Sequence, residues 1–172
     1  TLVLAGVAGA AVQQGDTELD LLGSFKALNG DAANNKDTYS IEVGLGYFVT
    51  DNVQVGVFAG GSWEEEDTDD GDDEIMKYNL GGSTKYHFMP TNQWVPYIGA
   101  RIAYAYEETD PAVGEDDKFD GLEYGPVAGL RFELNANNDF FAEYRYVLYG
   151  QDLEDQNDEM HAVYFGIIHQ FK

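Results

Sequence analysis

Nine carboxylates occupy the eleven positions from residue 64 to residue 74, with no basic residue among them. Oxygen ligands of this kind suit hard divalent cations such as Ca²⁺. The spacing before Gly71 does not fit the calcium-loop pattern D-x-[DN]-x-[DN]-G, because Thr68 and Glu66 stand at two of its ligand positions. We therefore expect a diffuse surface that collects Ca²⁺ loosely, or else a solvated, self-repelling run with no ligand. The nine residues are Glu64, Glu65, Glu66, Asp67, Asp69, Asp70, Asp72, Asp73 and Glu74.

Residue types that carry acid–base or nucleophilic catalysis are scarce. Histidine occurs only as His87, His161 and His169, and cysteine is absent. The alternation described below places His87 on the opposite face from the other two, which lie toward opposite ends of one segment. No Ser-His-Asp set or nucleophile elbow is present. The sequence predicts no catalytic site and no dedicated cofactor.

The charge balance excludes nucleic acid as a partner. The 172 residues carry nine Lys and Arg against 32 Asp and Glu, a formal net charge of −23. A phosphate backbone is bound through clustered basic side chains. The length fits one domain. Twelve Tyr, ten Phe and twenty Gly indicate β structure.

Apolar and other residues alternate with a period of two from residue 17 onward, which is typical of strands with two different faces. The connections alternate in length. Short turns fall at 50–52, 89–93 and 135–138, and longer polar connections fall at 29–37, 65–73, 109–118 and 151–158. This pattern predicts an all-β, eight-stranded, antiparallel up-and-down barrel with short and long connections at opposite ends. The expected strands are 17–28, 38–50, 53–64, 74–88, 94–108, 119–134, 139–150 and 159–171.

One face of the expected strands is rich in Tyr, Phe, Trp, Leu, Ile and Val, whereas the other is polar or very small. An eight-stranded barrel has room inside for only a limited set of side chains. Packing the apolar face inward would overfill it, so we expect the polar face to line the lumen. Eight glycines share that face: Gly44, Gly46, Gly56, Gly60, Gly81, Gly99, Gly125 and Gly129.

Long charged side chains on the polar face are expected near mid-barrel. Buried charges persist when they are paired, so the sequence predicts an ion-pair network that plugs the lumen. The alternative is an ion path with Arg101, Arg131 and Arg145 at its constriction. The expected network consists of Glu42, Lys85, Arg101, Arg131, Glu143 and Arg145.

Three stretches resemble the eight-stranded outer-membrane barrels of the OmpA transmembrane-domain and OmpX type. They are WVPYIGARIAYAYE (94–107), GYFVTDNVQVGV (46–57) and the closing VYFGIIHQFK (163–172). The resemblance implies a monomer in the bacterial outer membrane, with periplasmic termini and extracellular acidic loops. Implied partners are membrane lipid, lipopolysaccharide and the barrel-assembly machinery. Such barrels serve structural or surface-interaction roles, form narrow porin-like channels, or in a few cases modify outer-leaflet lipid. A soluble lipocalin-like binder would need the inverted face assignment.

The first residues form an apolar run of small side chains, TLVLAGVAGAAVQQ. Such a run is typical of the later part of a secretory signal. We expect 1–14 to be a signal-peptide remnant or an N-terminal segment, and 15–172 to be the barrel domain.

Overall fold

Eight β-strands follow one another along the chain. The computed structural model describes residues 12–28, 36–68, 71–110, 117–151 and 159–171. No described residue belongs to a helix that is long and apolar enough to cross a membrane. The strands are β1 (Thr17–Leu28), β2 (Lys36–Phe48), β3 (Val53–Thr68), β4 (Gly71–His87), β5 (Trp94–Asp110), β6 (Asp117–Asn135), β7 (Asn138–Gln151) and β8 (Glu159–Phe171).

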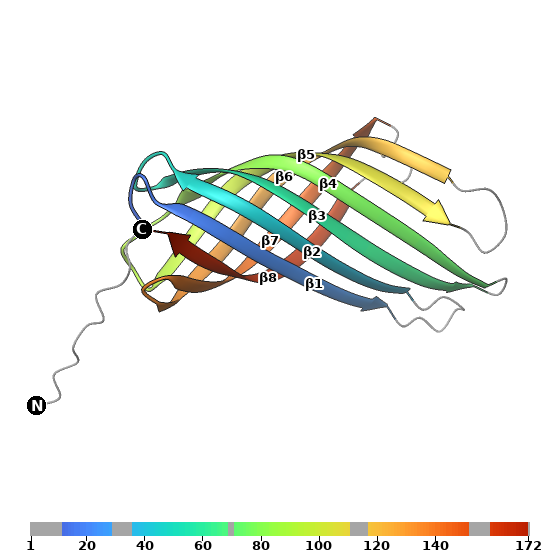
Figure 1. Ribbon diagram of the computed structural model, residues 1–172, viewed down its shortest axis with the longest axis horizontal. Coiled ribbons are helices and arrows are strands. Elements are labelled where there is room, and N and C mark those ends of the chain that lie inside the picture. Colours follow the sequence, from blue (N-terminus) through green and yellow to red (C-terminus); the bar gives the residue numbers. More distant parts are fainter. Residues whose placement is uncertain (1–11, 29–35, 69–70, 111–116, 152–158, 172) are drawn as a thin grey trace, which may run out of the picture.

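The strands close into a barrel in which each one pairs antiparallel with its neighbours in the chain, and β8 pairs with β1 (Figure 1). The short turns lie at one end, where β1 begins and β8 ends. The predicted eight-stranded up-and-down barrel is therefore confirmed. Its closing ladder is short, because Thr17–Gly23 faces Phe165–Phe171, whereas the β1–β2 ladder extends from Thr17 to Leu28.

The acidic run is mostly paired strand, which corrects the predicted connection at 65–73. β3 continues to Thr68 and β4 resumes at Gly71, so the two strands form one long hairpin. In its register Glu65 lies opposite Glu74, and Asp67 lies opposite Asp72. Backbone hydrogen bonds hold an antiparallel ladder together whatever the side chains are. The strand therefore continues beyond Trp63, although the alternation of apolar residues stops there. The end of the alternation indicates a change in what surrounds the strand, not the end of the strand.

The apolar face points outward, as predicted. Tyr39, Ile41 and Val43 on β2 are each nearly half exposed, and Leu80 on β4 is 67% exposed. The opposite parity is buried, with Glu42 at 7% and Arg131 at 2% exposure. This assignment excludes the lipocalin-like alternative, which needs an apolar interior.

The lumen also holds large aromatic rings, which corrects the expectation that its lining is only polar or very small. Phe48, Phe58 and Phe141 are all buried inside. Glycines make room for such rings across neighbouring strands. Phe58 lies opposite Gly81, and Phe141 lies opposite Gly166. A Cβ added at Gly166 would come 2.7 Å from Cε1 of Phe141. These contacts depend on strand register, which the alternation alone does not give.

Residues 12–16 pack against the turn end of the barrel. Val12 is buried, the backbone N–H of Gly15 donates to the Phe48 carbonyl at 2.9 Å, and the backbone N–H of Gln14 donates to Asp51 Oδ1 at 2.9 Å. The predicted boundary at residue 14 thus falls within a segment that contacts the β2–β3 turn. The rest of the predicted signal remnant, 1–11, lies outside the described residues.

Substituting Ala for Gly81 will destabilise the barrel by about 1–3 kcal/mol, the usual cost of overpacking. The new Cβ would lie 2.2 Å from the Ile102 carbonyl oxygen and 2.7 Å from the Ala103 Cβ. Gly82→Ala is the matched control, because a Cβ there meets nothing closer than 3.5 Å. Urea unfolding in detergent, followed by heat-modifiable gel migration, measures both variants. Equal midpoints for the two would contradict the packing assigned to Gly81.

Candidate functional site: the luminal charge network

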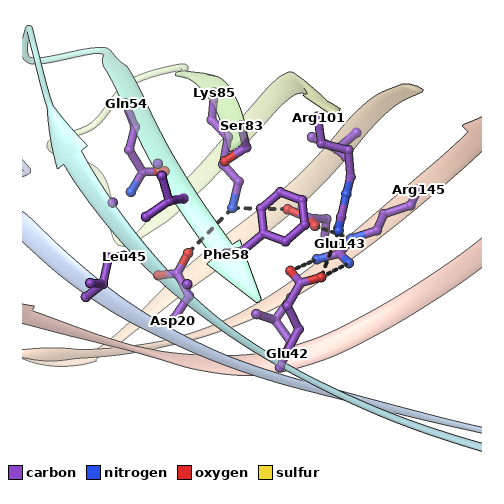
Figure 2. Close-up of a pocket in the computed structure, with 16 residues that line it drawn as sticks. Asp20, Glu42, Leu45, Gln54, Phe58, Ser83, Lys85, Arg101, Glu143 and Arg145 are labelled. Atoms are coloured by element: carbon purple, nitrogen blue, oxygen red, sulfur yellow. Dashed lines mark hydrogen bonds and ion pairs between the residues drawn. The ribbon is translucent and has the colours of Figure 1, made fainter. Parts of the chain in front are cut away.

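A central ion-pair cluster crosses the lumen. The Arg145 guanidinium donates two parallel hydrogen bonds to the Glu42 carboxylate, each 2.9 Å long. Arg101 donates a third to Glu42 Oε2 at 2.8 Å. These side chains come from β2, β5 and β7 and point toward one another in the barrel interior (Figure 2). Charge-assisted pairs of this two-pronged form are the stronger class of hydrogen bond.

Glu143 extends the cluster to the other side of the lumen. Its Oε1 accepts a hydrogen bond from Arg145 Nε at 2.6 Å, and its Oε2 accepts one from the Tyr97 hydroxyl at 2.9 Å. Lys85 Nζ lies 3.2 Å from Glu143 Oε2 and 3.7 Å from Asp20 Oδ2 (Figure 2). The cluster therefore links β1, β2, β4, β5 and β7.

The central cluster is charge-balanced. Three carboxylates face three cationic groups, so its formal charge is zero. Removing charges from water costs free energy that their mutual attraction must offset. The balanced set meets that condition best at Glu42, Glu143 and Arg145, each of which makes at least three hydrogen bonds or ion pairs to the other members or to Tyr97. The members are Asp20, Glu42, Glu143, Lys85, Arg101 and Arg145.

Arg131 differs from its predicted place in the central network. It pairs instead with Glu18, through bonds of 2.6 and 3.2 Å, and with Asp139, whose Oδ2 accepts from Arg131 Nε at 2.5 Å. Two amides complete this turn-end cluster, because Gln54 donates to Glu18 and Gln170 donates to Asp139. A count of residues from the nearest turn does not include the stagger of tilted strands around a barrel, so it places Arg131 too high. Arg131 pairs with Phe141, the fourth residue of β7, and therefore lies near the turn end.

A third cluster lies toward the long-hairpin end. Lys77 Nζ is 2.7 Å from Glu123 Oε1 and 3.8 Å from Glu107 Oε2. It also lies 4.5 Å from the centroid of the Tyr149 ring. Asn79 donates to Glu123 at 3.4 Å. The lumen thus carries three successive tiers of ion pairs.

Aromatic rings fill the space between these tiers. The Arg101 guanidinium stacks 4.0 Å from the centre of the Phe58 ring, and that of Arg145 lies 4.0 Å from the Tyr164 ring. The cavity lined by the central cluster has a volume of about 20 Å³, which is room for about one water molecule.

Three luminal carboxylates escaped the sequence prediction: Glu18, Asp20 and Asp139. All three are buried, and each is paired with a cationic side chain. A signal was present, because Glu18 and Asp20 share the parity of Lys26 in β1, and Asp139 shares that of Glu143 and Arg145 in β7. Strand parity alone therefore places all three on the inner face.

The histidines take the positions that parity predicts. His87 is buried, with its ring 5.1 Å from that of Phe48 and 5.2 Å from that of Tyr97. His161 is exposed, 2.5 Å from the Tyr144 hydroxyl, and His169 lies 2.9 Å from Asn138 Oδ1. Within the described ranges, no three His, Asp or Glu side chains gather as a metal site would require.

The predicted cation surface falls largely beyond the described part of the chain. Asp69 and Asp70 lie outside the described residues, and for residues 65–68 and 71–74 the description covers the backbone alone. Glu64 is described, and its Oε2 accepts a hydrogen bond from the Thr38 hydroxyl at 3.1 Å. The cation surface therefore stays a prediction.

The curated relatives include opacity proteins opA67 and opA66 of Neisseria gonorrhoeae. They are 26% and 27% identical over alignments of 124 residues, which cover 54% of this chain. The chain spans about half the length of these curated relatives, 53% and 52% respectively.

Solved structures share the fold. Neisserial surface protein A aligns with a TM-score of 0.67 and 20% identity, over 92% of this chain and 98% of that one. The N-terminal β-barrel domain of Pseudomonas aeruginosa OprF aligns at 0.61 and 20%, over 92% and 99%. Ail, the attachment invasion locus protein of Yersinia pestis, in complex with the heparin analogue sucrose octasulfate, aligns at 0.62 and 13%, over 92% and 99%. The family model described as "Outer membrane protein beta-barrel domain" matches residues 1–171, so the chain belongs to that family of eight-stranded outer-membrane barrels.

Proposed function

We propose that this protein is a non-enzymatic barrel with a structural or surface-interaction role, whose lumen is plugged and whose long hairpins carry the interacting surface. The balanced central cluster is the observation that carries this proposal. Three carboxylates and three cations meet across the narrow interior, and the cavity beside them has a volume of about 20 Å³. A solute path would need these buried pairs to separate. The opacity and attachment proteins among its relatives support a role at the cell surface.

The termini are proposed to be periplasmic and the long hairpins extracellular. Outer-membrane barrels place short turns in the periplasm and longer connections outside. Here β1 begins and β8 ends at the short-turn end (Figure 1). Aromatic pairs at that end suit a membrane interface, with Trp94 4.4 Å from Phe132 and Tyr86 5.0 Å from Phe88 between ring centres. The barrel-assembly machinery would read the closing strand, β8.

The chemistry of the outer surface favours cations over anions. Of the 32 acidic residues, 23 lie in or beside the four predicted long connections. The Ail structure contains a polyanion, sucrose octasulfate, whereas this chain would repel one. We infer that its partners are cationic, or are lipopolysaccharide phosphates bridged by divalent cations such as Ca²⁺.

A plugged lumen predicts that the purified protein in planar lipid bilayers shows no large, steady conductance at neutral pH, with or without Ca²⁺. The cavity beside the central ion pairs has a volume of about 20 Å³, room for about one water molecule, so we expect no continuous water path past them. Single-channel recording measures this. Steady openings of uniform size would overturn the plugged lumen and favour the alternative, a narrow channel.

Glu42→Gln will reduce the free energy of unfolding by about 3–5 kcal/mol, because it leaves two buried guanidinium groups without their shared carboxylate. Urea titration in detergent measures the change. Asp51→Asn is the control, since Asp51 is exposed in the β2–β3 turn. A loss at position 42 no larger than that at position 51 would mean that the cluster does not stabilise the barrel.

Removing opposed charges on the β3–β4 hairpin will weaken Ca²⁺ binding. Asp67 and Asp72 are partners in the β3–β4 backbone register, and like charges on directly opposed residues of a ladder are destabilising. A bound cation would offset that repulsion. Isothermal calorimetry should show less Ca²⁺ bound by the Asp67→Asn, Asp72→Asn double variant than by the unaltered protein. Asp51→Asn, at the opposite end, is the control. Identical heats for all three proteins would remove the cation hypothesis.

A further inference from the structure

The outward face of β3 to β7 contains a groove of about 640 Å³, which is far larger than the cavity of about 20 Å³ beside the central cluster. Its floor is made of small side chains and one proline ring: Thr84, Ala100, Pro126 and Ala128. These residues are neighbours across the sheet, since Thr84 pairs with Ala100 and Ala100 pairs with Pro126. The apolar face is therefore hollowed where its side chains are shortest.

Large side chains flank this floor. Tyr86, Ile98 and Tyr144 line the groove and are 46%, 52% and 43% exposed. Elsewhere the outward face carries bulky residues, among them Leu80 and Ile102. The groove volume lies within the range of small-molecule sites, ~300–1,000 Å³.

The groove climbs from one membrane surface to the middle of the bilayer. At its low end lies Val53, the first residue of β3, and its row of partners runs through Tyr86, Ile98 and Ala128 to Tyr144. Tyr144 is six residues above the start of β7. At ~3.3 Å per residue and ordinary strand tilt, that places it roughly 15 Å higher, about half the thickness of the hydrocarbon core. One leaflet's acyl chain spans the same depth.

We propose that this groove binds one acyl chain of a phospholipid as a resident lipid, held more tightly than the lipids around it. The groove is continuous with the apolar face that contacts the membrane, so hydrocarbon is the material that meets it. Its low end adjoins the polar β2–β3 turn, Thr50 to Asn52, where a headgroup would lie. Filling the concave floor brings more apolar surface into contact than a chain lying on a convex barrel wall.

This inference goes beyond the proposed surface role and does not depend on it. It needs only that the short-turn end lies at a membrane surface, whichever side that is. A second copy of the chain is the competing occupant of the groove. Small residues also allow the membrane-facing surfaces of two protein molecules to approach closely.

The test is native mass spectrometry of the full chain released from vesicles of phosphatidylethanolamine and phosphatidylglycerol. Ala100→Leu and Ala128→Leu fill the groove. Ala59→Leu, on the outward face of β3 outside it, is the matched control. The unaltered protein and the control should retain one phospholipid, and the two filling variants should retain about tenfold less. Heat-modifiable migration checks that each variant is folded.

Equal lipid retention in all four proteins, or none in the unaltered protein, would overturn the proposal. So would chemical cross-linking that yields a dimer of the unaltered protein and of Ala59→Leu but not of the filling variants, because the groove would then be occupied by a second copy. Vesicles that contain only one of the two phospholipids separate recognition of a headgroup from recognition of the acyl chain. Retention from both supports the acyl chain, whereas retention from one alone overturns it.

Discussion

The bond between Arg145 and Glu42 constrains most of what surrounds it. The two residues stand on β7 and β2, which are not neighbours in the barrel wall, so their bidentate contact spans the interior. This contact can form only if the barrel is narrow enough for the two side chains to meet. The remaining hydrogen-bonding positions of the carboxylate and the guanidinium must also have partners of opposite charge. Arg101 and Glu143 satisfy the second condition by pairing with the free positions of the same two groups. The diameter of the barrel and the composition of its lining are thus linked through one electrostatic requirement.

The same requirement explains where glycine is placed. Long charged side chains and aromatic rings fill the lumen. Where such a side chain packs against a neighbouring strand, that strand needs a residue without a Cβ. A Cβ at Gly129 would lie 2.2 Å from Tyr97 Cζ, and Tyr97 is the residue that donates to Glu143. Small residues on the lumen side therefore support the ion pairs indirectly, by leaving room for the ring that completes them.

The period of two predicted much of this from the sequence, because burial in a barrel follows strand parity residue by residue. It located Glu42, Lys85 and Arg145 on the inner face, and it placed the face rich in Tyr, Phe, Trp, Leu, Ile and Val outside, where Leu80 and Ile102 lie. Parity does not give the relative heights of residues on different strands. Arg131 is therefore predicted in the central cluster but lies in the turn-end cluster. Parity also could not show that Phe58 fits inside, since that depends on having Gly81 directly opposite. The dense charge at 65–73 predicts a loop, whereas the β3–β4 ladder continues there because it needs only backbone groups.

Seven of the eight ladders join strands that follow one another in the chain, and the β1–β8 ladder joins its two ends. Bringing Thr17 to Phe171 closes a loop of nearly the whole domain, so this step has the largest chain-entropy cost of any pairing in the molecule. It is also supported by a short ladder that stops at Gly23. Hairpins with local contacts form quickly, whereas long-range pairing is slow. The closing ladder is therefore the step expected to set both the folding rate and the lifetime of the closed barrel.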